Sequence, residues 1–445
     1  MKLHSTNLQS PAVDLKEAVI NGLAPDGGLY MFDQITALPE DFFANIDSMS
    51  FAQMAFEVSK ALLQGAVPDE DLRKIVEDTL AFDAPLVQVS PSDQIYSLEL
   101  FHGPTLAFKD FGARFMARLL SYFVKGSNEE ITVLVATSGD TGSAVAHGFL
   151  NVPGIKVVIL YPSGKVSELQ EKQLTTMGAN ISALEVDGTF DDCQDMVKKA
   201  FVDADLNASL KLTSANSINI ARLIPQSFYY FYAYAQLSPE QRLRQPIFSV
   251  PSGNFGNLTA GLIAKKMGLP VHKFLAATNA NDTFPQYLES GDFHAKPSLP
   301  TISNAMDVGN PSNFARIREL YRDDVQALRQ DVWSHSFSDL ETQEVMREVY
   351  EKYRYTLDPH GAVAYLGLKK YYAENLASSH TSAPDFHPGI LLETAHPAKF
   401  GETVKQATGV APEIPERLAE YAKREKVSIK MNADFSKLRA LLLSW

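Results

Sequence analysis

The sequence is poor in the features that mark secreted, metal-clustered and membrane-embedded proteins. Among its 445 residues Cys193 is the single cysteine, which excludes an intrachain disulfide and a cluster of thiolate metal ligands. The His, Asp and Glu residues lack the spacing of a metal site, so we predict no metal. The longest aromatic run, FYYFYAYAQL from Phe228, is too short to cross a bilayer. We expect it to be a buried helix.

Basic charge is also scarce. The chain has 40 Lys and Arg residues against 53 Asp and Glu residues, a net charge of −13. That balance argues against nucleic acids and anionic membranes as partners, although a pocket with its own local field can still bind an anionic small molecule. The first residues, MKLHSTNLQSPAVDLKEAVI, lack the apolar core of a signal peptide. We therefore expect a cytoplasmic protein.

Two patterns of apolar residues meet near residue 95. Before it, helical spacing runs through VDLKEAVINGL, FAQMAFEVSKALL and DLRKIVEDTLAF. After it, short apolar runs alternate with helical stretches, as in parallel sheets covered by helices on both faces. The runs expected to be buried strands are ITVLVA, KVVILY, ISALEV, IFSV, FLAATN and GILLET. We predict an α/β fold with a mainly helical N-terminal domain (1–95), a large α/β domain (96–128 and 223–445) and a small α/β domain (129–222).

Lys109 stands in an unusual setting, within the apolar string TLAFKDFGARF. One interpretation is an ordinary first-turn lysine whose stem lies along an apolar surface, with Asp110 as the N-cap of a helix. The other is an amine desolvated so that it can act as a nucleophile. Taken alone, the string favours the first interpretation.

Three expected strands end in loops with unusual residues: TSGDTG, PSGNFGN and TAHPAKF, which begin at Thr137, Pro251 and Thr394. Glycines allow close backbone approach, and free N–H groups at a helix N-terminus attract anions. PSGNFGN is therefore a candidate phosphate cradle. Neither glycine-rich loop is a Walker A or a dinucleotide motif. Taken alone, either loop is more often just a tight strand-to-helix turn with a capping serine.

A desolvated lysine and a phosphate cradle together fit pyridoxal phosphate, which binds lysine as a Schiff base and withdraws electrons from carbanions. The ring nitrogen then needs a partner, and Thr394 offers a hydroxyl without a full charge, although it is also a possible N-cap. Lys399 is the alternative candidate for the Schiff-base lysine, although a lysine in this position more often has a structural role. His102, His360 and His396 lie near these motifs, but hydrogen-bonded structural histidines are commoner than catalytic ones.

Taken together, the motifs resemble the threonine synthases of the longer form, which have an extra N-terminal domain. The motifs are HGPTLAFKDFG, TSGDTG, PSGNFGN, NAMDVGNPSNF, LDPHGAVAYLG and TAHPAKF. The resemblance implies the tryptophan-synthase-β-like fold of pyridoxal-phosphate enzymes (fold type II). It also implies the conversion of O-phospho-L-homoserine and water into L-threonine and phosphate. The expected partner is this small molecule, with no nucleic acid and no membrane, and the expected state is a monomer or homodimer.

By position, the resemblance makes Lys109 the Schiff-base lysine and Thr394 the hydroxyl at the pyridine nitrogen. The implied cofactor-phosphate loop consists of Gly253, Asn254, Phe255, Gly256 and Asn257. The loop that faces the substrate and the cofactor's 3′-oxygen contains Thr137, Ser138, Gly139, Asp140 and Thr141, with Asp140 assigned to the cofactor. Relatives in the wider fold usually have asparagine in place of that aspartate. The segment NSINIARLIPQ implies Asn219 and Arg222 near the substrate's phosphate.

The implied chemistry begins with removal of the Cα proton by the neutral amine of Lys109. Loss of a Cβ proton then expels phosphate from Cγ, reprotonation gives an unsaturated intermediate, and water adds at Cβ. Arg222 and the TSGDTG loop are the candidates for stabilising the departing phosphate. Alternatives are another pyridoxal-phosphate lyase or dehydratase, a β-replacement enzyme, a noncatalytic phosphate- or nucleotide-binding protein, and an inactive homologue.

Overall fold

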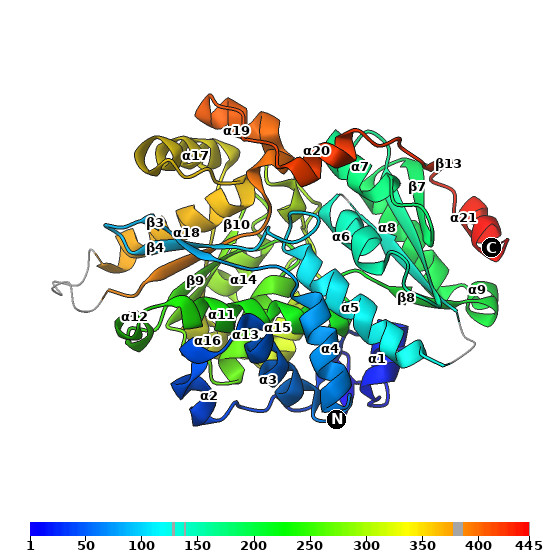
Figure 1. The fold of residues 1–445 in the computed structure, drawn as a ribbon, viewed down its shortest axis with the longest axis horizontal. Coiled ribbons are helices and arrows are strands. Elements are labelled where there is room, and N and C mark those ends of the chain that lie inside the picture. The colour runs from blue at the N-terminus through cyan, green and yellow to red at the C-terminus, as the bar shows by residue number, and fades with distance from the viewer. Residues whose placement is uncertain (127–129, 138, 377–385, 445) are drawn as a thin grey trace.

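Two sheets lie side by side, with the N-terminal helices packed beneath them (Figure 1). The computed structural model describes residues 1–126, 130–137, 139–376 and 386–444. The larger sheet has the strand order β11-β10-β9-β12-β4-β3, and the smaller one β13-β7-β6-β5-β8. Helices cover both, which confirms the predicted α/β class with two sheet units.

The larger sheet is parallel except at one edge, where β3 runs antiparallel to β4. Its strands are β3 (Leu86–Ser90), β4 (Ile95–Glu99), β9 (Ile247–Pro251), β10 (Lys273–Thr278), β11 (Val332–Ser336) and β12 (Gly389–Glu393). Strands β9 and β12 are buried along their whole length, as a sheet covered on both faces requires. The adjacent strands β4 and β12 end at the same edge of the sheet.

All strands of the smaller sheet are parallel. They are β5 (Ile131–Ala136), β6 (Ile155–Pro162), β7 (Ile181–Asp187), β8 (Lys211–Ser214) and β13 (Ile429–Asn432). The six strands expected from apolar runs are thus all present across the two sheets. The short strands β3, β4, β8, β11 and β13 were not predicted.

The predicted domain boundaries depart from the sheets at two places. Strand β3 belongs to the larger sheet, although it lies inside the predicted N-terminal domain of residues 1–95. Strand β13 joins the smaller sheet, although the segment 223–445 was assigned to the large domain. Most of β13 is exposed, so it has no apolar run that would mark it as a strand. Elsewhere the boundaries stay predictions.

The N-terminal unit is mainly helical, as expected, and also has a small antiparallel pair of strands. It contains β1 (Leu3–Ser5), β2 (Tyr30–Phe32), α1 (Leu15–Asn21), α2 (Glu40–Ala44), η1 (Ile46–Ser48), α3 (Phe51–Leu63) and α4 (Asp69–Thr79). Helix α3 begins at a capping box in which the Ser50 and Gln53 side chains bind each other's backbone N–H groups. The strand β1–β2 pair was not predicted, because each of its strands has only three residues.

The remaining helices surround the two sheets. Those up to residue 266 are α5 (Lys109–Val124), α6 (Asp140–Phe149), α7 (Glu168–Thr175), α8 (Phe190–Val202), α9 (Ala204–Ser209), α10 (Ile220–Leu223), η2 (Ile224–Gln226), α11 (Phe228–Gln236), α12 (Pro239–Leu243) and α13 (Gly256–Lys266). Those beyond it are α14 (Thr283–Ser290), η3 (Asn304–Met306), α15 (Phe314–Leu320), α16 (Val325–Asp331), α17 (Asp339–Tyr353), α18 (Pro359–Leu376), η5 (Pro397–Phe400), α19 (Gly401–Thr408), α20 (Glu416–Ala422) and α21 (Phe435–Leu443).

Helices α5 and α11 lie in the interior of the molecule. Phe111 and Phe115 of α5 have no exposed surface, and neither has Phe228 at the start of α11. The ring of Phe115 contacts that of Phe228 edge to face, with 5.8 Å between ring centroids. The aromatic run of α11 is therefore a buried helix, as predicted. Its packing fixes the axis of α5, whose first residue is Lys109.

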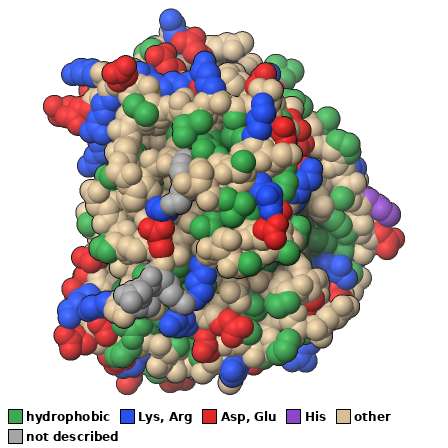
Figure 2. Space-filling view, turned by 90° about the vertical axis from the view of Figure 1, so that its right-hand side faces the viewer, with side chains coloured by type: hydrophobic (Ala, Val, Ile, Leu, Met, Phe, Trp, Pro, Cys, Tyr) green, Lys and Arg blue, Asp and Glu red, His purple; other side chains and the backbone are tan. Residues whose placement is uncertain are grey.

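Basic and acidic side chains are mixed on the face that carries the smaller sheet (Figure 2). The net charge of −13 is therefore not gathered into a single acidic patch on this side. No helix in the described ranges is both long enough and apolar enough to cross a membrane.

Candidate active site

Lys109 begins helix α5 in a turn that is fastened to the end of strand β12. The N–H group of Phe108 donates to the carbonyl oxygen of Thr394 at 2.9 Å, and the N–H group of His396 donates to that of Leu106 at 3.0 Å. Leu106 has a positive φ of 59°, which turns the chain sharply just before the helix. The lysine is thus held against the TAHPAKF segment by backbone contacts.

The amine of Lys109 has no hydrogen-bond or ion-pair partner among the described residues. The residue is half-buried, and the ring of Phe108 lies beside it, with 4.7 Å from Nζ to the centroid. Burial and, to a smaller extent, the charge of Arg222 lower the pKa of Lys109 to about 8, against the opposing charge of Asp140. A substantial fraction of the amine is therefore neutral near physiological pH.

The TSGDTG loop joins β5 to α6 and is closed on itself. The hydroxyl oxygen of Thr137 accepts hydrogen bonds from the N–H groups of Gly139 and Gly142, at 3.0 and 2.8 Å. Gly139 has a φ of 145°, and a Cβ there would lie 2.7 Å from the side chain of Gln170, so the position requires glycine. Ser138, predicted to face the substrate, lies outside the described residues.

Asp140 opens helix α6 and pairs with the rival lysine. Its Oδ1 lies 2.6 Å from Nζ of Lys399 and accepts a hydrogen bond from the Gln170 side chain at 2.8 Å. Burial alone would raise the pKa of Asp140, but the charge and hydrogen bond of Lys399 bring it below the usual value. Thr141, next in the helix, remains partly exposed. Asp140 thus holds a charged partner from another part of the chain.

Lys399 lies in η5 and has two oxygen partners. Besides Asp140, its ammonium donates to the carbonyl oxygen of Thr105 at 2.8 Å, and the residue is only 3 % exposed. Thr105 in turn donates its N–H group and its hydroxyl to the Asp110 carboxylate, both at 2.8 Å. Burial raises the pKa of Asp110 to about 6. The Lys399 amine is therefore committed to an ion pair that supports the turn before Lys109.

The PSGNFGN loop joins β9 to α13 and leaves its backbone donors free. Within the described part of the chain, no acceptor binds the N–H groups of residues 253–257. Phe255 is in the left-handed region with φ of 60°, which directs successive N–H groups to one side. A Cβ at Gly253 would lie 2.6 Å from the Cα of Met306, so the backbone of η3 packs directly on the loop. These free donors at a helix N-terminus suit a phosphate.

Two asparagine side chains fix the shape of this loop. Asn254 donates to the hydroxyl oxygen of Ser217 and accepts from the N–H group of Ser312, both at 2.6 Å. Asn257 donates to the carbonyl oxygen of Pro251 at 2.9 Å. The amide of Asn254 therefore ties the loop to two distant segments, and that of Asn257 closes it onto the end of its own strand.

Thr394 follows directly on strand β12 and is 6 % exposed. Its carbonyl oxygen accepts a hydrogen bond from the N–H group of Phe108. Its hydroxyl has no hydrogen-bond partner among the described residues. A neutral hydroxyl in this position can accept from or donate to an aromatic nitrogen. The adjacent carboxyl of Glu393 is fully buried, and burial and the neighbouring Asp358 raise its pKa well above the usual value.

Asn219 has a different setting from the one predicted. It is the N-cap of α10, where its Oδ1 accepts from the N–H group of Ala221 at 3.0 Å. Its Nδ2 donates to the carbonyl oxygens of Val19 and Ser214, at 2.9 and 3.1 Å, and the residue has no exposed surface. In this arrangement the amide is committed to backbone groups, so its predicted contact with the substrate's phosphate would require those bonds to break.

Arg222 retains an unused donor in the interior. The residue is 3 % exposed, and its Nη1 donates to the carbonyl oxygen of Ala215, while Nε has no partner. A Cβ at Gly112 of α5 would lie 2.7 Å from this Nε, so the guanidinium packs directly on the helix of Lys109. Burial lowers the pKa of Arg222 to about 10, although Asp110 opposes the change. The guanidinium therefore stays cationic near neutral pH.

The three histidines near the motifs are all hydrogen-bonded. His360 lies with Nδ1 2.5 Å from Oδ1 of Asp358 and accepts from the N–H group of Ala305 at Nε2. His102 contacts Glu99 at 2.7 Å. His396 accepts from the N–H group of Ala398 at 3.1 Å, and burial lowers its pKa to about 4. These partners match the structural role that we expected for them.

Sequence reasoning missed three residues that border the site: Ser217, Asn313 and Arg316. Ser217 accepts hydrogen bonds from the side chains of Asn254 and Asn313, at 2.6 and 3.2 Å. Arg316 binds the carbonyl oxygen of Ser217 and the side chain of Asn313. NSINIARL did mark the segment of Ser217, but the serine could not be distinguished from its neighbours without its partner.

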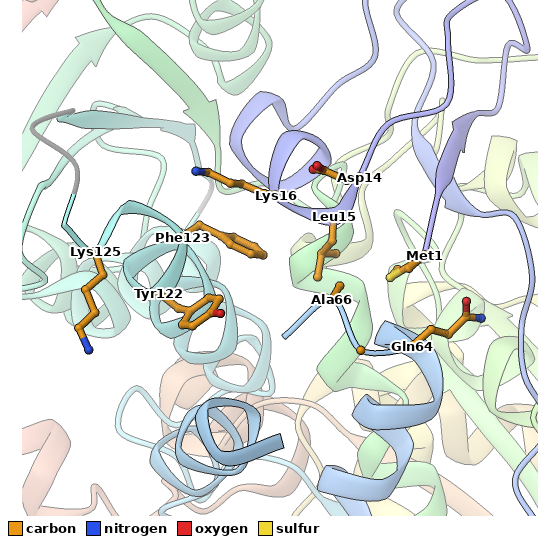
Figure 3. A pocket seen from close by; sticks show the side chains of 10 residues that line it. Met1, Asp14, Leu15, Lys16, Gln64, Ala66, Tyr122, Phe123 and Lys125 are labelled. Carbon is orange, nitrogen blue, oxygen red and sulfur yellow. The ribbon is translucent and has the colours of Figure 1, made fainter. Parts of the chain in front are cut away.

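A surface hollow of about 620 Å³ lies elsewhere, between the N-terminal unit and the far end of α5 (Figure 3). Tyr122 and Phe123 line it from α5, Lys125 from just beyond that helix, and Leu15 from α1. At 1.5 Å of rise per residue, Phe123 is roughly 20 Å along the helix from Lys109. The hollow is separate from the polar groups described above.

The residues present fit pyridoxal phosphate. An amine with a lowered pKa, free N–H groups at a glycine-rich helix N-terminus and an unpartnered hydroxyl correspond to the aldehyde, the phosphate and the ring nitrogen of that cofactor. No group of His, Cys, Asp and Glu within the described ranges could hold a metal ion.

Three family descriptions together match nearly the whole chain. Residues 80–382 match "Pyridoxal-phosphate dependent enzyme", residues 2–80 match "Threonine synthase N terminus", and residues 372–442 match "Threonine synthase, C-terminal". The first of these covers more than half of the sequence. The N-terminal match ends at residue 80, before strand β3.

Full-length relatives carry the same name. The chain is 45% identical over 443 residues to a threonine synthase of Haemophilus influenzae and 44% identical over 450 residues to that of Escherichia coli, and each match covers 100% of both chains. The crystal structure of the Escherichia coli threonine synthase superposes with a TM-score of 0.90 at 43% identity, again over 100% of both chains.

A threonine synthase of Brucella melitensis, solved with pyridoxal phosphate bound, superposes with a TM-score of 0.91 at 33% identity. That match covers 100% of this chain and 99% of the other. A threonine deaminase from Solanum lycopersicum, 14% identical, matches with a TM-score of 0.56 over 86% of this chain and 98% of its own. This last likeness shows the fold alone, that of fold type II pyridoxal-phosphate enzymes.

Proposed function

The chain belongs to the threonine synthase family of pyridoxal-phosphate-dependent enzymes, and on that premise we propose that it converts O-phospho-L-homoserine and water into L-threonine and phosphate. It acts on a small molecule, and we place the reaction in the cytoplasm. The observation that carries the proposal is the half-buried amine of Lys109, which has no described partner and a pKa of about 8.

The proposal divides cofactor binding among three parts of the chain. Lys109 takes the aldehyde, the N–H groups of residues 253–257 take the phosphate, and the hydroxyl of Thr394 faces the ring nitrogen. When bound, the cofactor withdraws electrons from the substrate's carbon skeleton, so that the protons on Cα and Cβ become removable. A hydroxyl in place of a carboxylate at the ring nitrogen makes this withdrawal milder.

Lys109 moves the protons. Its amine is the unpaired base at the site, and a pKa of about 8 allows it both to accept a proton and to return it near neutral pH. In this proposal it removes the proton from the substrate's Cα and serves the later transfer at Cβ. The positive charge of Arg222 supports this role because it keeps the pKa of Lys109 low.

Departure of phosphate from Cγ concentrates negative charge, and the site has donors for it. Arg222 is cationic and has a free Nε–H group. The first turn of α6 adds backbone N–H groups near Asp140 and Thr141. Donors that are already oriented lower the barrier to charge development without a cost of rearrangement. We assign these groups to the substrate's phosphate.

The test supplies O-phospho-L-homoserine to the purified holoenzyme and follows threonine and free phosphate together. We expect equal amounts of both products from the wild type. Lys109→Ala should lose at least about 10³-fold in kcat/KM, as removal of a central catalytic group does. Lys125→Ala is the matched control, because this lysine is exposed just beyond the other end of α5.

Other outcomes would contradict the proposal in distinguishable ways. Phosphate without threonine would mean an elimination enzyme of the same fold. A yellow, borohydride-reducible protein without turnover would exclude the substrate and keep the cofactor. Wild-type activity in Lys109→Ala would remove the lysine from the mechanism.

A further inference from the structure

Arg316 is a buried cation without a buried anion. It lies in α15 with no exposed surface, and no carboxylate of the described residues pairs with it. Burial lowers the pKa of Arg316 to about 9, so the guanidinium is still charged at neutral pH. Burying a charge is costly unless a counter-charge or a set of hydrogen bonds compensates it.

Four hydrogen bonds connect Arg316 to three separate parts of the chain. Nε donates to the carbonyl oxygen of Tyr30 in β2, at 3.0 Å. Nη1 donates to the carbonyl oxygen of Ser217 and to Oδ1 of Asn313, at 3.1 and 2.6 Å, and Nη2 donates to the carbonyl oxygen of Ile218 at 2.6 Å. The acceptors are all neutral, so these bonds orient the guanidinium but do not neutralise it.

The partners of Arg316 lie directly against the PSGNFGN loop. The hydroxyl of Ser217 accepts from both Asn254 and Asn313, which joins the loop to the Arg316 network. A Cβ at Gly256 would have the Asn313 and Ser217 side chains as its nearest neighbours, at 3.5 and 3.6 Å. One layer of side chains therefore separates the guanidinium from the N-terminus of α13.

We propose that Arg316 is a positioning residue that fixes the phosphate loop through Ser217 and Asn313, and that its charge is balanced by the cofactor's phosphate. The inference rests on the assignment of residues 253–257 as the phosphate cradle. It also gives the N-terminal unit a part in cofactor binding, because Tyr30 supplies one of the four acceptors. A dianion at the loop interacts favourably with both the helix N-terminus and the buried cation.

The experiment compares pyridoxal phosphate with pyridoxal, which lacks the phosphate. Full-length holoenzyme is dialysed to equilibrium against graded concentrations of each, and the dissociation constants are measured for the wild type, Arg316→Gln and Arg316→Lys. We expect Arg316→Gln to weaken the affinity for pyridoxal phosphate by roughly 10- to 100-fold. A loss of this size is typical when an outer partner of a ligand-binding group is removed. Pyridoxal affinity should change by less than about threefold.

Arg316→Lys retains the charge and should lose less affinity for pyridoxal phosphate than Arg316→Gln does. Arg318→Gln is the matched control, because Arg318 lies on the same helix but pairs with Asp323 at the surface. It should behave as the wild type. If Arg316→Gln does not fold, Ser217→Ala leaves Arg316 in place and should weaken pyridoxal phosphate selectively, since it removes the acceptor of Asn254.

If Arg316→Gln weakened the affinities for pyridoxal and pyridoxal phosphate equally, Arg316 would have only a packing role, and the proposal would be overturned. Unchanged affinity for both would also overturn it, and so would a loss in Arg316→Lys as large as in Arg316→Gln. Because the assay needs no substrate, its result is independent of whether O-phospho-L-homoserine is turned over.

Discussion

Lys109 and Lys399 follow neighbouring strands of one sheet and have opposite surroundings. Lys109 comes after β4 and Lys399 after β12, and these strands are paired in parallel. Lys399 has the carboxylate of Asp140 at 2.6 Å, whereas Lys109 has no described partner and a pKa of about 8. Lys399 is buried, whereas Lys109 is partly exposed, so the two amines differ both in their partner and in their access to the site.

The paired lysine also supports the unpaired one. Lys399 donates to the carbonyl oxygen of Thr105, four residues before Lys109, and an isolated bridge joins Ala107 to Ala395. Hydrogen bonds therefore tie the Lys399 turn to the Lys109 turn. A change at Lys399 should act on stability, and a change at Lys109 should act on chemistry.

The largest expected effect is on stability at the paired lysine. Lys399→Met leaves Asp140 buried and unpaired, so we expect a loss of about 3–5 kcal/mol in the free energy of unfolding. The measurement is urea denaturation of the cofactor-free protein. In the double variant Lys399→Met, Asp140→Asn most of that loss should be recovered, because the uncompensated charge is gone.

Lys109→Met is the matched control for that comparison. Its ammonium has no partner to lose, so the substitution should leave the cofactor-free protein as stable as the wild type or slightly more stable. A loss as large as that of Lys399→Met would show that Lys109 also has a structural counter-charge, and the contrast between the two lysines would fail.

The next effect is on the pH dependence of Lys109. A lysine reacts as the neutral amine, so modification of Lys109 by trinitrobenzenesulfonate in the cofactor-free protein should rise with pH, half-maximal near pH 8. Arg222→Gln removes a neighbouring positive charge and should move that midpoint upward, whereas Asp140→Asn removes a negative charge and should move it downward. We expect shifts on the order of one pH unit or less, since both charges are partly screened.

Peptide mapping of the modified protein supplies the readout. A midpoint near the ordinary lysine value of pH 10.5 would show that the amine is solvated. Shifts of the opposite sign in the two variants would mean that Arg222 and Asp140 do not act on Lys109 through their charges.

Most of the fold and the centre of the candidate site were predictable from local sequence. Apolar runs such as ITVLVA and GILLET mark strands because a fully buried strand must be apolar along its length. The glycines of PSGNFGN mark a loop whose backbone N–H groups stay free of acceptors in the described structure, and LAFKDFG stands out because a cation is rare in an apolar string. These signals each lie within a few residues.

The rest depends on contacts between residues far apart in the chain. Asp140 and Lys399 are 259 positions apart, and nothing near either of them predicts the ion pair. In FARIREL, Arg316 and Arg318 look alike, yet one is buried under Tyr30 and the other is at the surface. The exposed strand β13 lacks an apolar run altogether. Such features arise from tertiary packing, which local pattern does not encode.

The most direct test of the central claim is to reduce the holoenzyme with borohydride and map the modified peptide. Borohydride fixes the cofactor on the lysine that holds it. The account predicts the label on Lys109, in the peptide containing LAFKDFG, and an unmodified Lys399. A label on Lys399 in HPAKF would contradict it, because the amine paired with Asp140 would then be the one that is free to react.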